Sequence, residues 1–172
     1  MSMTTKRKNI YAMSHKDFDA LMEKNGWNDA DGAAPNVAII SICCSPAFRE
    51  KYFKRHNTRD EHWFKCNDFR NVLNVDFDDI VEESRETEYG TAYGISDEQA
   101  KQIVKFVKDN RDVDEWYIHC HAGISRSVAV AAWIRNYYLN NKQDAKAHTA
   151  HGFMGENAFV YKKLENNDKD IS

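Results

Sequence analysis

The chain has 172 residues and a formal net charge of −3, with 24 Lys and Arg residues against 27 Asp and Glu residues. This length suits a single domain over residues 1–172, and a hydrophobic content of 42% is enough for one buried core. The nearly balanced charge argues against a protein that binds nucleic acid or anionic membranes through bulk positive charge.

Neither a secretory signal nor a membrane span is evident. The basic residues Lys6, Arg7 and Lys8 precede no apolar segment of signal-peptide length, and no apolar run approaches the ~18 residues of a membrane span. The cysteines show neither a CxxC pair nor the spacing of a disulfide framework; they are Cys43, Cys44, Cys66 and Cys120. We therefore expect a cytoplasmic protein with reduced thiols and no membrane partner.

The first half of the chain predicts a helix, a strand and a second short helix. Ser14 can cap a helix over residues 15–25, and Gly26 can end it. The continuous apolar run 36–42 is typical of a strand that is covered on both faces. The mixed basic and aromatic segment 45–70 predicts a short helix followed by an irregular link.

The middle of the chain predicts a strand, a long loop and a well-marked helix. Apolar residues at every second position predict a strand that ends near Phe77. The acidic segment 78–94 follows as an expected long loop. Ser96 and Gln99 form a capping-box pattern at the start of a helix over 95–110.

The last third predicts a buried strand and three further helices. The strand covers 115–120, and the helix over 125–141 is so apolar in its first half that it must be central. Two shorter helices are expected at 144–151 and 157–166. Strands that alternate with helices predict an α/β fold, a single-domain sandwich with a central, mostly parallel sheet flanked by helices.

The segment HCHAGISRS, residues 119–127, lies between the last predicted strand and the central helix. Open α/β sheets bind ligands at the carboxyl ends of their strands, and a helix N-terminus attracts anions. Gly123 allows a tight turn, and Arg126 offers a planar fork to a tetrahedral oxyanion. A thiol in such a field becomes a nucleophilic thiolate near neutral pH. One loop therefore supplies a nucleophile, Cys120, and a phosphate clamp.

The order HCxxGxxRS resembles the signature of the cysteine-dependent protein tyrosine phosphatases, and the short chain resembles their dual-specificity branch. More narrowly, the segments VAIISI, VLNVDFDDI, ISDEQAKQIVKFV, IHCHAGISRS and NAFVYKKL resemble a small cytoplasmic phosphatase-like family of bacteria and phages. The resemblance implies a single dual-specificity phosphatase-like domain, with the protein tyrosine phosphatase-like fold. It also implies hydrolysis of phosphomonoesters through a phosphocysteine intermediate.

The resemblance also implies a role for each residue of the loop. Cys120 matches the nucleophile, Ser127 matches the hydroxyl that helps the thiolate leave, and His119 matches a supporting residue that orders the loop. The phosphate cradle matches the backbone of the loop together with the Arg126 side chain, that is, His121, Ala122, Gly123, Ile124, Ser125 and Arg126.

A departing phenolate or alkoxide needs a proton, so a carboxylic acid is expected nearby. In the family this aspartate follows the end of a sheet strand upstream of the cysteine. Asp76 still belongs to the predicted strand, and the family pattern favours Asp79 as the acid, with Asp78 as the alternative and Glu82 or Glu83 as remaining candidates. The acidic loop is longer than in compact relatives, so the register of the acid stays open here.

We expect no metal ion and no cofactor. His119, Cys120 and His121 are adjacent in the chain, and successive strand residues point to opposite faces, so the three fit one metal poorly. His62 and Cys66 have a ligand-like offset, but no second pair with matching spacing accompanies them.

Three other residues have simpler expected roles. Cys43 and Cys44 end a buried strand, where small buried hydrophobes are the favoured interpretation. The alternative is a disulfide partner that protects Cys120 from oxidation. Asn157 is expected to tie the last helix to the core, and contact with the loop 119–127 is the alternative.

The expected partner is a phosphorylated protein or peptide, carrying phosphotyrosine and also phosphoserine or phosphothreonine. An RNA 5′-phosphatase or triphosphatase is the first alternative, and only this reading involves nucleic acid. It draws on the interleaved basic and aromatic residues Phe48, Arg49, Lys51, Tyr52, Phe53, Lys54, Arg55 and Arg59. Three of these, Phe48, Tyr52 and Arg55, also fit one face of an amphipathic helix. The second alternative is a phosphate-binding module without turnover.

Overall fold

Five parallel strands form the central sheet in the computed structural model, which describes residues 6–66 and 68–169. The strands lie in the order β3-β2-β6-β1-β7, and every neighbouring pair is parallel. Their bounds are β1 (Lys8–Ser14), β2 (Val37–Cys43), β3 (Val72–Asp76), β6 (Glu115–Cys120) and β7 (Ala145–His148). The predicted α/β fold with a mostly parallel sheet is confirmed.

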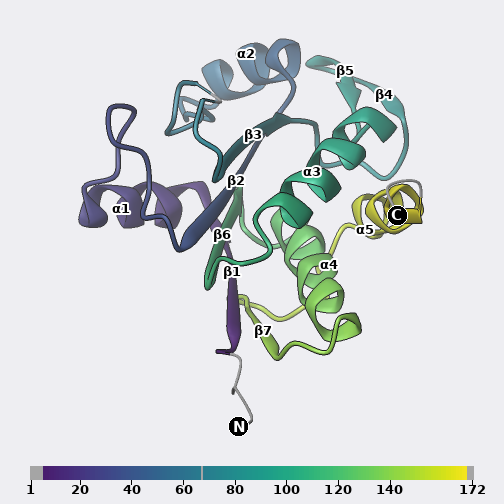
Figure 1. Cartoon of the computed structure of the whole chain (residues 1–172). Coiled ribbons are helices and arrows are strands. Elements are labelled where there is room, and N and C mark those ends of the chain that lie inside the picture. The colour runs from purple at the N-terminus through teal and green to yellow at the C-terminus, as the bar shows by residue number, and fades with distance from the viewer. Residues whose placement is uncertain (1–5, 67, 170–172) are drawn as a thin grey trace, which may run out of the picture.

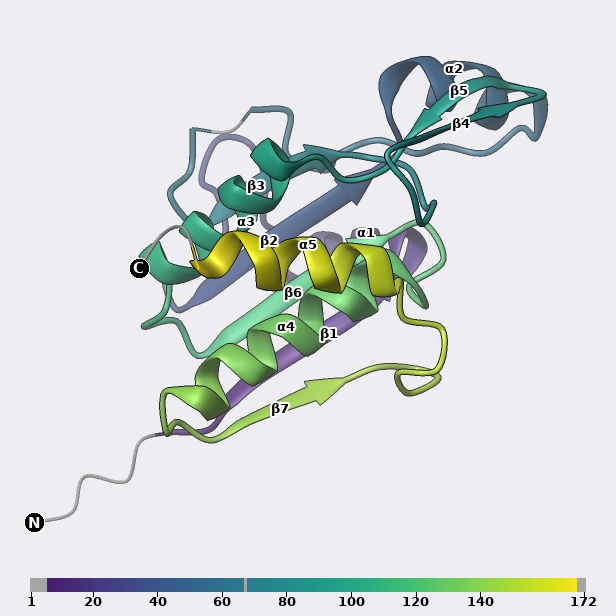
Figure 2. The ribbon, with the colours of Figure 1, turned by 90° about the vertical axis from the view of Figure 1, so that its right-hand side faces the viewer.

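Helices cover both faces of this sheet (Figure 1). One face carries α1 (His15–Asn25), whereas the other carries α3 (Asp97–Asp109), α4 (Arg126–Asn140) and α5 (Ala158–Asp168). The remaining helix, α2 (Pro46–Arg55), lies at the end of the sheet to which β2 points (Figure 2). That end therefore collects the segments that follow the carboxyl ends of the strands.

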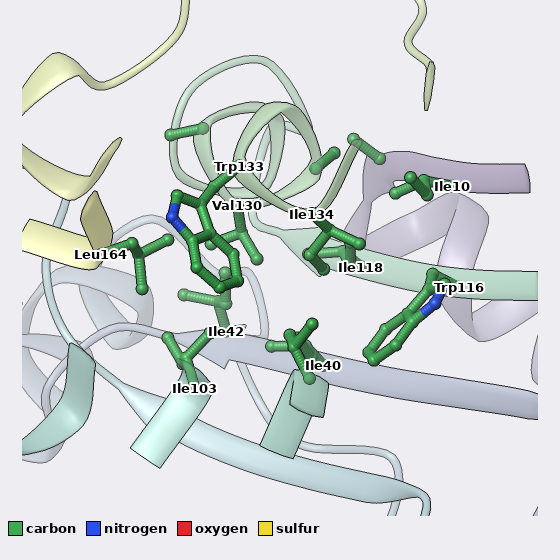
Figure 3. Close-up of a cluster of buried hydrophobic side chains, with 14 of the residues drawn as sticks. Ile10, Ile40, Ile42, Ile103, Trp116, Ile118, Val130, Trp133, Ile134 and Leu164 are labelled. Atoms are coloured by element: carbon green, nitrogen blue, oxygen red, sulfur yellow. The ribbon is translucent and has the colours of Figure 1, made fainter. Parts of the chain in front are cut away.

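The larger part of the core lies between the sheet and helices α3, α4 and α5. Ile40 and Ile118 of the sheet are fully buried there (Figure 3). The helices contribute Ile103 from α3, Val130, Trp133 and Ile134 from α4, and Leu164 from α5. A smaller cluster under α1 contains Phe18, Met22, Val37, Ile39, Phe64 and Val72. Because β2 is buried along its whole length, both clusters pack against it.

Capping residues set the ends of two helices as the sequence predicts. The Ser14 side chain accepts a hydrogen bond from the backbone of Asp17, and Gly26 ends α1 in the left-handed conformation, with φ 67°. At the start of α3, Ser96 and Gln99 form a reciprocal capping box. These local signals explain why both helices begin within a residue or two of their predicted positions.

The acidic segment is not the plain loop that the sequence predicts. It contains an antiparallel hairpin of β4 (Ser84–Thr87) and β5 (Gly90–Tyr93), with Gly90 at a positive φ of 101° in the turn. The hairpin lies beside α2 at the end of the sheet (Figure 2). Its strand side chains are mostly polar and exposed, so hydrophobic periodicity gave no signal for it.

The predicted helix over 144–151 is wrong, because Ala145–His148 forms β7. This short edge strand pairs with β1, another strand that the sequence analysis did not predict. Pairing across the sheet outweighs the local preference of these few residues. Within the described part of the chain, no helix has both the length and the apolar character needed to cross a membrane.

Candidate active site

The signature loop, residues 120–127, leads from the last residue of β6, Cys120, into the first turn of α4, which begins at Arg126. Gly123 adopts a positive φ of 77° in this loop. A Cβ atom at this position would lie 2.4 Å from the Ser14 nitrogen and 2.5 Å from the Met13 carbonyl carbon. Glycine is therefore required both by the turn and by the close approach of the loop to the end of β1.

Cys120 lies at the base of the loop and is only 2% exposed. Its Sγ atom accepts a hydrogen bond from the Gly123 backbone N–H at 3.3 Å and lies 3.1 Å from the Ser127 Oγ atom. Both groups can donate a hydrogen bond to the sulfur.

Arg126 is buried beside this cysteine, with 3% exposure. Its Nη1 atom donates to the Phe77 carbonyl oxygen at 2.7 Å and lies 3.6 Å from the Cys44 sulfur, whereas no described residue pairs with its Nε atom. Burial alone would lower the pKa of Arg126, but Cys44, Cys120 and neighbouring carboxylates raise it overall. The guanidinium therefore remains a cation with an N–H free for an oxyanion.

Asp78 and Asp79 have different surroundings, although they are adjacent. Asp78 is 2% exposed, and its carboxylate accepts hydrogen bonds from the Ser45 backbone at 2.8 Å, the Ser45 hydroxyl at 2.5 Å and the Tyr93 backbone at 2.7 Å. These contacts join the start of α2 to the hairpin. The Asp78 carboxylate therefore already accepts three hydrogen bonds, although Asp78 also lines the pocket that contains Cys120.

Asp79 is exposed and faces the signature loop. Its Oδ1 atom accepts hydrogen bonds from the Ser125 hydroxyl at 2.7 Å and from the Asn157 amide at 2.8 Å. It also lines the same pocket as Cys120 and Arg126. Of the two aspartates, Asp79 therefore has the accessible position that a general acid needs.

Asn157 does more than tie the last helix to the core. Its Oδ1 atom caps α5, and its backbone N–H donates to the Ser125 carbonyl oxygen at 3.2 Å. Its Nδ2 group donates both to Asp79 and to the Ile80 carbonyl oxygen at 3.1 Å. The alternative expectation, contact with the signature loop, is thus met by the hydrogen bond to Ser125, whereas the contact with the candidate acid was not predicted.

His119 lies behind the loop and is fully buried. Its Nε2 atom is 2.6 Å from the Ser41 hydroxyl oxygen, and its ring packs against Phe18 with 4.2 Å between the ring centroids. Burial lowers the pKa of His119 to about 3. A neutral imidazole held in this way can support the loop, and it does not line the pocket.

The pocket above Cys120 has a volume of about 310 Å³. One wall comes from α2, through Phe48, Tyr52 and Phe53, and another comes from the hairpin, through Arg85, Thr87 and Ala92. Tyr52 stacks on Phe48 with 5.3 Å between ring centroids and meets Tyr89 of the hairpin turn edge-on at 5.0 Å. The basic and aromatic segment thus forms part of the pocket wall.

Cys43 and Cys44 are both buried free thiols. Cys44 lines the pocket, and burial raises its pKa to about 12.

His62 contacts the Ser41 hydroxyl at 2.6 Å and the Asp76 carboxylate at 2.7 Å. Among the described residues, the His, Cys, Asp and Glu clusters that could hold a metal include neither Cys66 nor Cys120.

No protein-family model, no curated protein and no solved structure matches this chain. The chemistry of the pocket is therefore inferred from its residues and their geometry.

Proposed function

We propose that the protein is a cysteine-dependent phosphatase that hydrolyses phosphomonoesters of proteins or peptides in a cytoplasmic compartment. One observation carries the proposal: the Cys120 sulfur lies between the Gly123 N–H and the Ser127 hydroxyl, beside the buried Arg126 cation, in a loop that matches HCxxGxxRS. Asp79 borders the same pocket. The resemblance to dual-specificity phosphatases supports the same assignment.

In the first step, the Cys120 thiolate attacks phosphorus and the bond from phosphorus to the leaving oxygen breaks. Asp79 gives its proton to that oxygen, so the product leaves as a phenol or an alcohol. Backbone N–H groups of the loop and the Arg126 side chain stabilise charge on the remaining phosphoryl oxygens.

In the second step, water attacks the phosphocysteine and the sulfur–phosphorus bond breaks. The Asp79 carboxylate accepts the proton from water, and the Ser127 hydroxyl, 3.1 Å from the sulfur, stabilises the departing thiolate. Inorganic phosphate leaves, and both Cys120 and Asp79 return to their starting states. The step needs no cofactor and no metal at the reacting atoms.

The pocket walls support a preference for aryl phosphates. Phe48 and Tyr52 offer apolar ring surface beside the cradle, and such surface suits the ring of phosphotyrosine. Phosphoserine and phosphothreonine have no ring to fill this wall, so their turnover is expected to be slower. The proposed partner is therefore a phosphorylated protein or peptide.

One observation favours an RNA 5′-phosphatase or triphosphatase as the second candidate. The Arg55 guanidinium lies 5.7 Å from the centre of the Tyr89 ring, near the aromatic wall. A cation combined with ring surface can hold a base and a phosphate together. A phosphate-binding module without turnover is a third reading, but it leaves the exposed Asp79 without a role.

The deciding experiment compares phosphotyrosine peptide, phosphothreonine peptide and 5′-triphosphorylated RNA as substrates. A radiolabelled phosphoryl group should appear on the protein after rapid quenching, and Cys120→Ser should bind phosphate analogues but form no adduct. Cys66→Ser serves as the matched control and should keep both adduct and turnover. Normal turnover in Cys120→Ser would overturn the proposal, and faster RNA turnover would favour the second candidate.

A further inference from the structure

Three buried polar atoms without hydrogen-bond partners lie close together behind the signature loop. They are His15 Nδ1, Asp60 Oδ1 and His121 Nδ1. The Asp60 oxygen is 3.9 Å from the His15 nitrogen and 4.0 Å from the His121 nitrogen, too far for a direct hydrogen bond to either. Buried polar atoms normally have hydrogen-bond partners or ligands. The gap between these three atoms is therefore a candidate binding position for an ion or a water molecule.

Cys43 adds a sulfur donor to the same place. Ligand atoms of His15, Cys43 and Asp60 all lie within 4.8 Å of one another, and all three residues are buried. Donor atoms around a tetrahedral zinc ion are about 3.3–3.8 Å apart, given bonds of about 2.0–2.3 Å. The His15 and Asp60 atoms are 3.9 Å apart, and no pair in the group exceeds 4.8 Å, so the donors must move closer by at most about 1.5 Å to hold such an ion.

Neighbouring groups orient these donors toward the gap. His15 Nε2 is 3.1 Å from the Asp19 carboxylate, which leaves Nδ1 to face the site. Asp60 Oδ2 accepts from the Cys44 backbone N–H at 2.7 Å, which leaves Oδ1 to do the same. Carboxylate–histidine pairs and hydrogen-bonded carboxylates of this kind are what surround metal ligands in proteins.

We propose that His15, Cys43 and Asp60 form a binding site for a divalent transition metal of the zinc type. The fourth ligand would be His121, whose Nδ1 atom is 4.0 Å from Asp60 Oδ1 and would move toward the bound ion. The donors come from the first residue of α1, the last residue of β2, the connection after α2 and the signature loop. The proposal is independent of the phosphatase activity, because the Cys120 sulfur is not among the donors.

The donor set selects the class of metal. Imidazole nitrogen and thiolate sulfur suit zinc and its neighbours, whereas calcium and magnesium prefer oxygen ligands. A Cys43 thiolate and an Asp60 carboxylate together balance a charge of two, so the buried site becomes neutral. Binding replaces the Cys43 thiol proton, which is released to water.

A second possible cluster, Cys43 with His62 and Asp76, is less suited to an ion. His62 Nε2 is already 2.7 Å from the Asp76 carboxylate, and His62 Nδ1 is 2.6 Å from the Ser41 hydroxyl. Its imidazole nitrogens are therefore satisfied without a metal. His62 instead lies 3.5 Å from the Cys43 sulfur and can help to orient it.

A solvent-accessible pocket provides a route to the proposed site. This pocket of about 380 Å³ is lined in part by His15, Asp19 and His62. Of the proposed ligands, His15 lines this pocket, and an ion bound to it would connect α1 and β2 to the signature loop through His121. Its role would be to brace the loop from behind and not to contact the substrate.

The test is a titration of the full-length Cys120→Ser protein with cobalt(II), which reports thiolate ligation by its charge-transfer absorption. Removing the Cys120 thiol first ensures that any such band comes from another cysteine, and the result does not depend on turnover. We expect one ion per chain, a tetrahedral visible spectrum and complete displacement by zinc. Absence of saturable binding would overturn the proposal and leave a water molecule or a His15–Asp60 ion pair as the occupant of the gap.

Variants in the same background identify the ligands. Cys43→Ala should abolish the charge-transfer band, and Asp60→Asn and His15→Gln should each weaken cobalt affinity at least ~10-fold. Cys66→Ser is the matched control and should keep the full band; loss of the band in that variant instead would refute the assignment. If Cys43→Ala fails to fold, the stoichiometry of the parent titration and the other two variants still decide.

Discussion

The amide of Asn157 donates a hydrogen bond of 2.8 Å to the carboxylate of Asp79, which is 78 positions earlier in the sequence. The same asparagine holds the Ser125 carbonyl oxygen with its backbone N–H. The candidate acid and the signature loop are thus fixed to one residue at the start of α5. This connection makes the position of the acid depend on the last helix of the fold.

Asp79→Asn should slow hydrolysis most for substrates with poor leaving groups. If Asp79 protonates the leaving oxygen, an alkyl phosphate or phosphotyrosine should lose about 10²- to 10⁴-fold in kcat. An aryl phosphate whose leaving group is a stable anion needs no proton, so its loss should be much smaller. Steady-state rates for a series of leaving groups, with the pH profile of each, provide the measurement.

The matched control is Asp78→Asn, one residue away. Because Asp78 accepts hydrogen bonds from Ser45 and Tyr93, this change should lower the melting temperature and leave the dependence on the leaving group intact. Equal losses for good and poor leaving groups in Asp79→Asn would move the acid role to another carboxylate.

Asn157→Ala should reproduce part of the Asp79 defect. Loss of the amide leaves the carboxylate with only the Ser125 hydroxyl, so the acid is less well positioned. We expect kcat for poor leaving groups to fall about 10-fold, with a smaller effect on good ones. A purely structural role would instead lower both rates equally together with the melting temperature. The variant Asn157→Ser keeps a side-chain oxygen for the helix cap but lacks the amide that donates to Asp79, so it separates the two effects.

Burial of neutral His119 should make folding stability depend on pH. Its pKa is 6.5 when exposed and about 3 in the fold because of burial, so the unfolded chain binds more protons between these values. Above pH 6.5 the imidazole is neutral in both states, so it imposes no cost on folding. As pH falls from 6.5 toward 3, only the unfolded chain binds the proton, and the free energy of unfolding decreases. The full effect is roughly 4 to 5 kcal/mol in the free energy of unfolding.

Denaturant unfolding across this pH range, in the presence of a chelator, measures the effect. His119→Asn is neutral throughout, so its free energy of unfolding should fall less steeply with decreasing pH than that of the parent. His151→Gln removes an exposed histidine and provides the control. Parallel slopes for the parent and His119→Asn would contradict a neutral, buried His119.

Removing the proposed metal with a chelator should change the stability of the protein without changing its rate of catalysis. The proposed ion lies behind the loop, so EDTA should leave turnover of phosphotyrosine peptide intact while it lowers the melting temperature of zinc-loaded protein. Calorimetry and initial rates on the same samples test both statements. Strict dependence of turnover on a divalent metal would indicate metal-assisted hydrolysis instead of thiolate attack.

Local signals made part of this structure predictable from the sequence. Ser14 and Gly26 set the ends of α1, the Ser96 capping box sets the start of α3, and the signature loop lies between β6 and α4 as expected. Such features depend on residues a few positions apart, where backbone and side-chain preferences act directly.

Features that depend on distant partners were not predictable. The short strand β7 exists because β1 pairs with it, and the hydrogen bonds from Ser45 and Tyr93 to the Asp78 carboxylate join segments that are far apart in the sequence. The cluster of His15, Cys43 and Asp60 combines donors from three separate segments, so no spacing in the sequence reveals it.

The close approach of Gly123 to Met13 and Ser14 has a consequence for synthesis of the chain. The first strand, β1, lies between β6 and β7, and Ser14 is in register with Cys120. The loop takes its shape against β1, and both strands that pair with β1 come much later in the chain. A ribosome-bound chain should therefore lack an ordered loop until β6 and β7 have both left the ribosome and paired with β1.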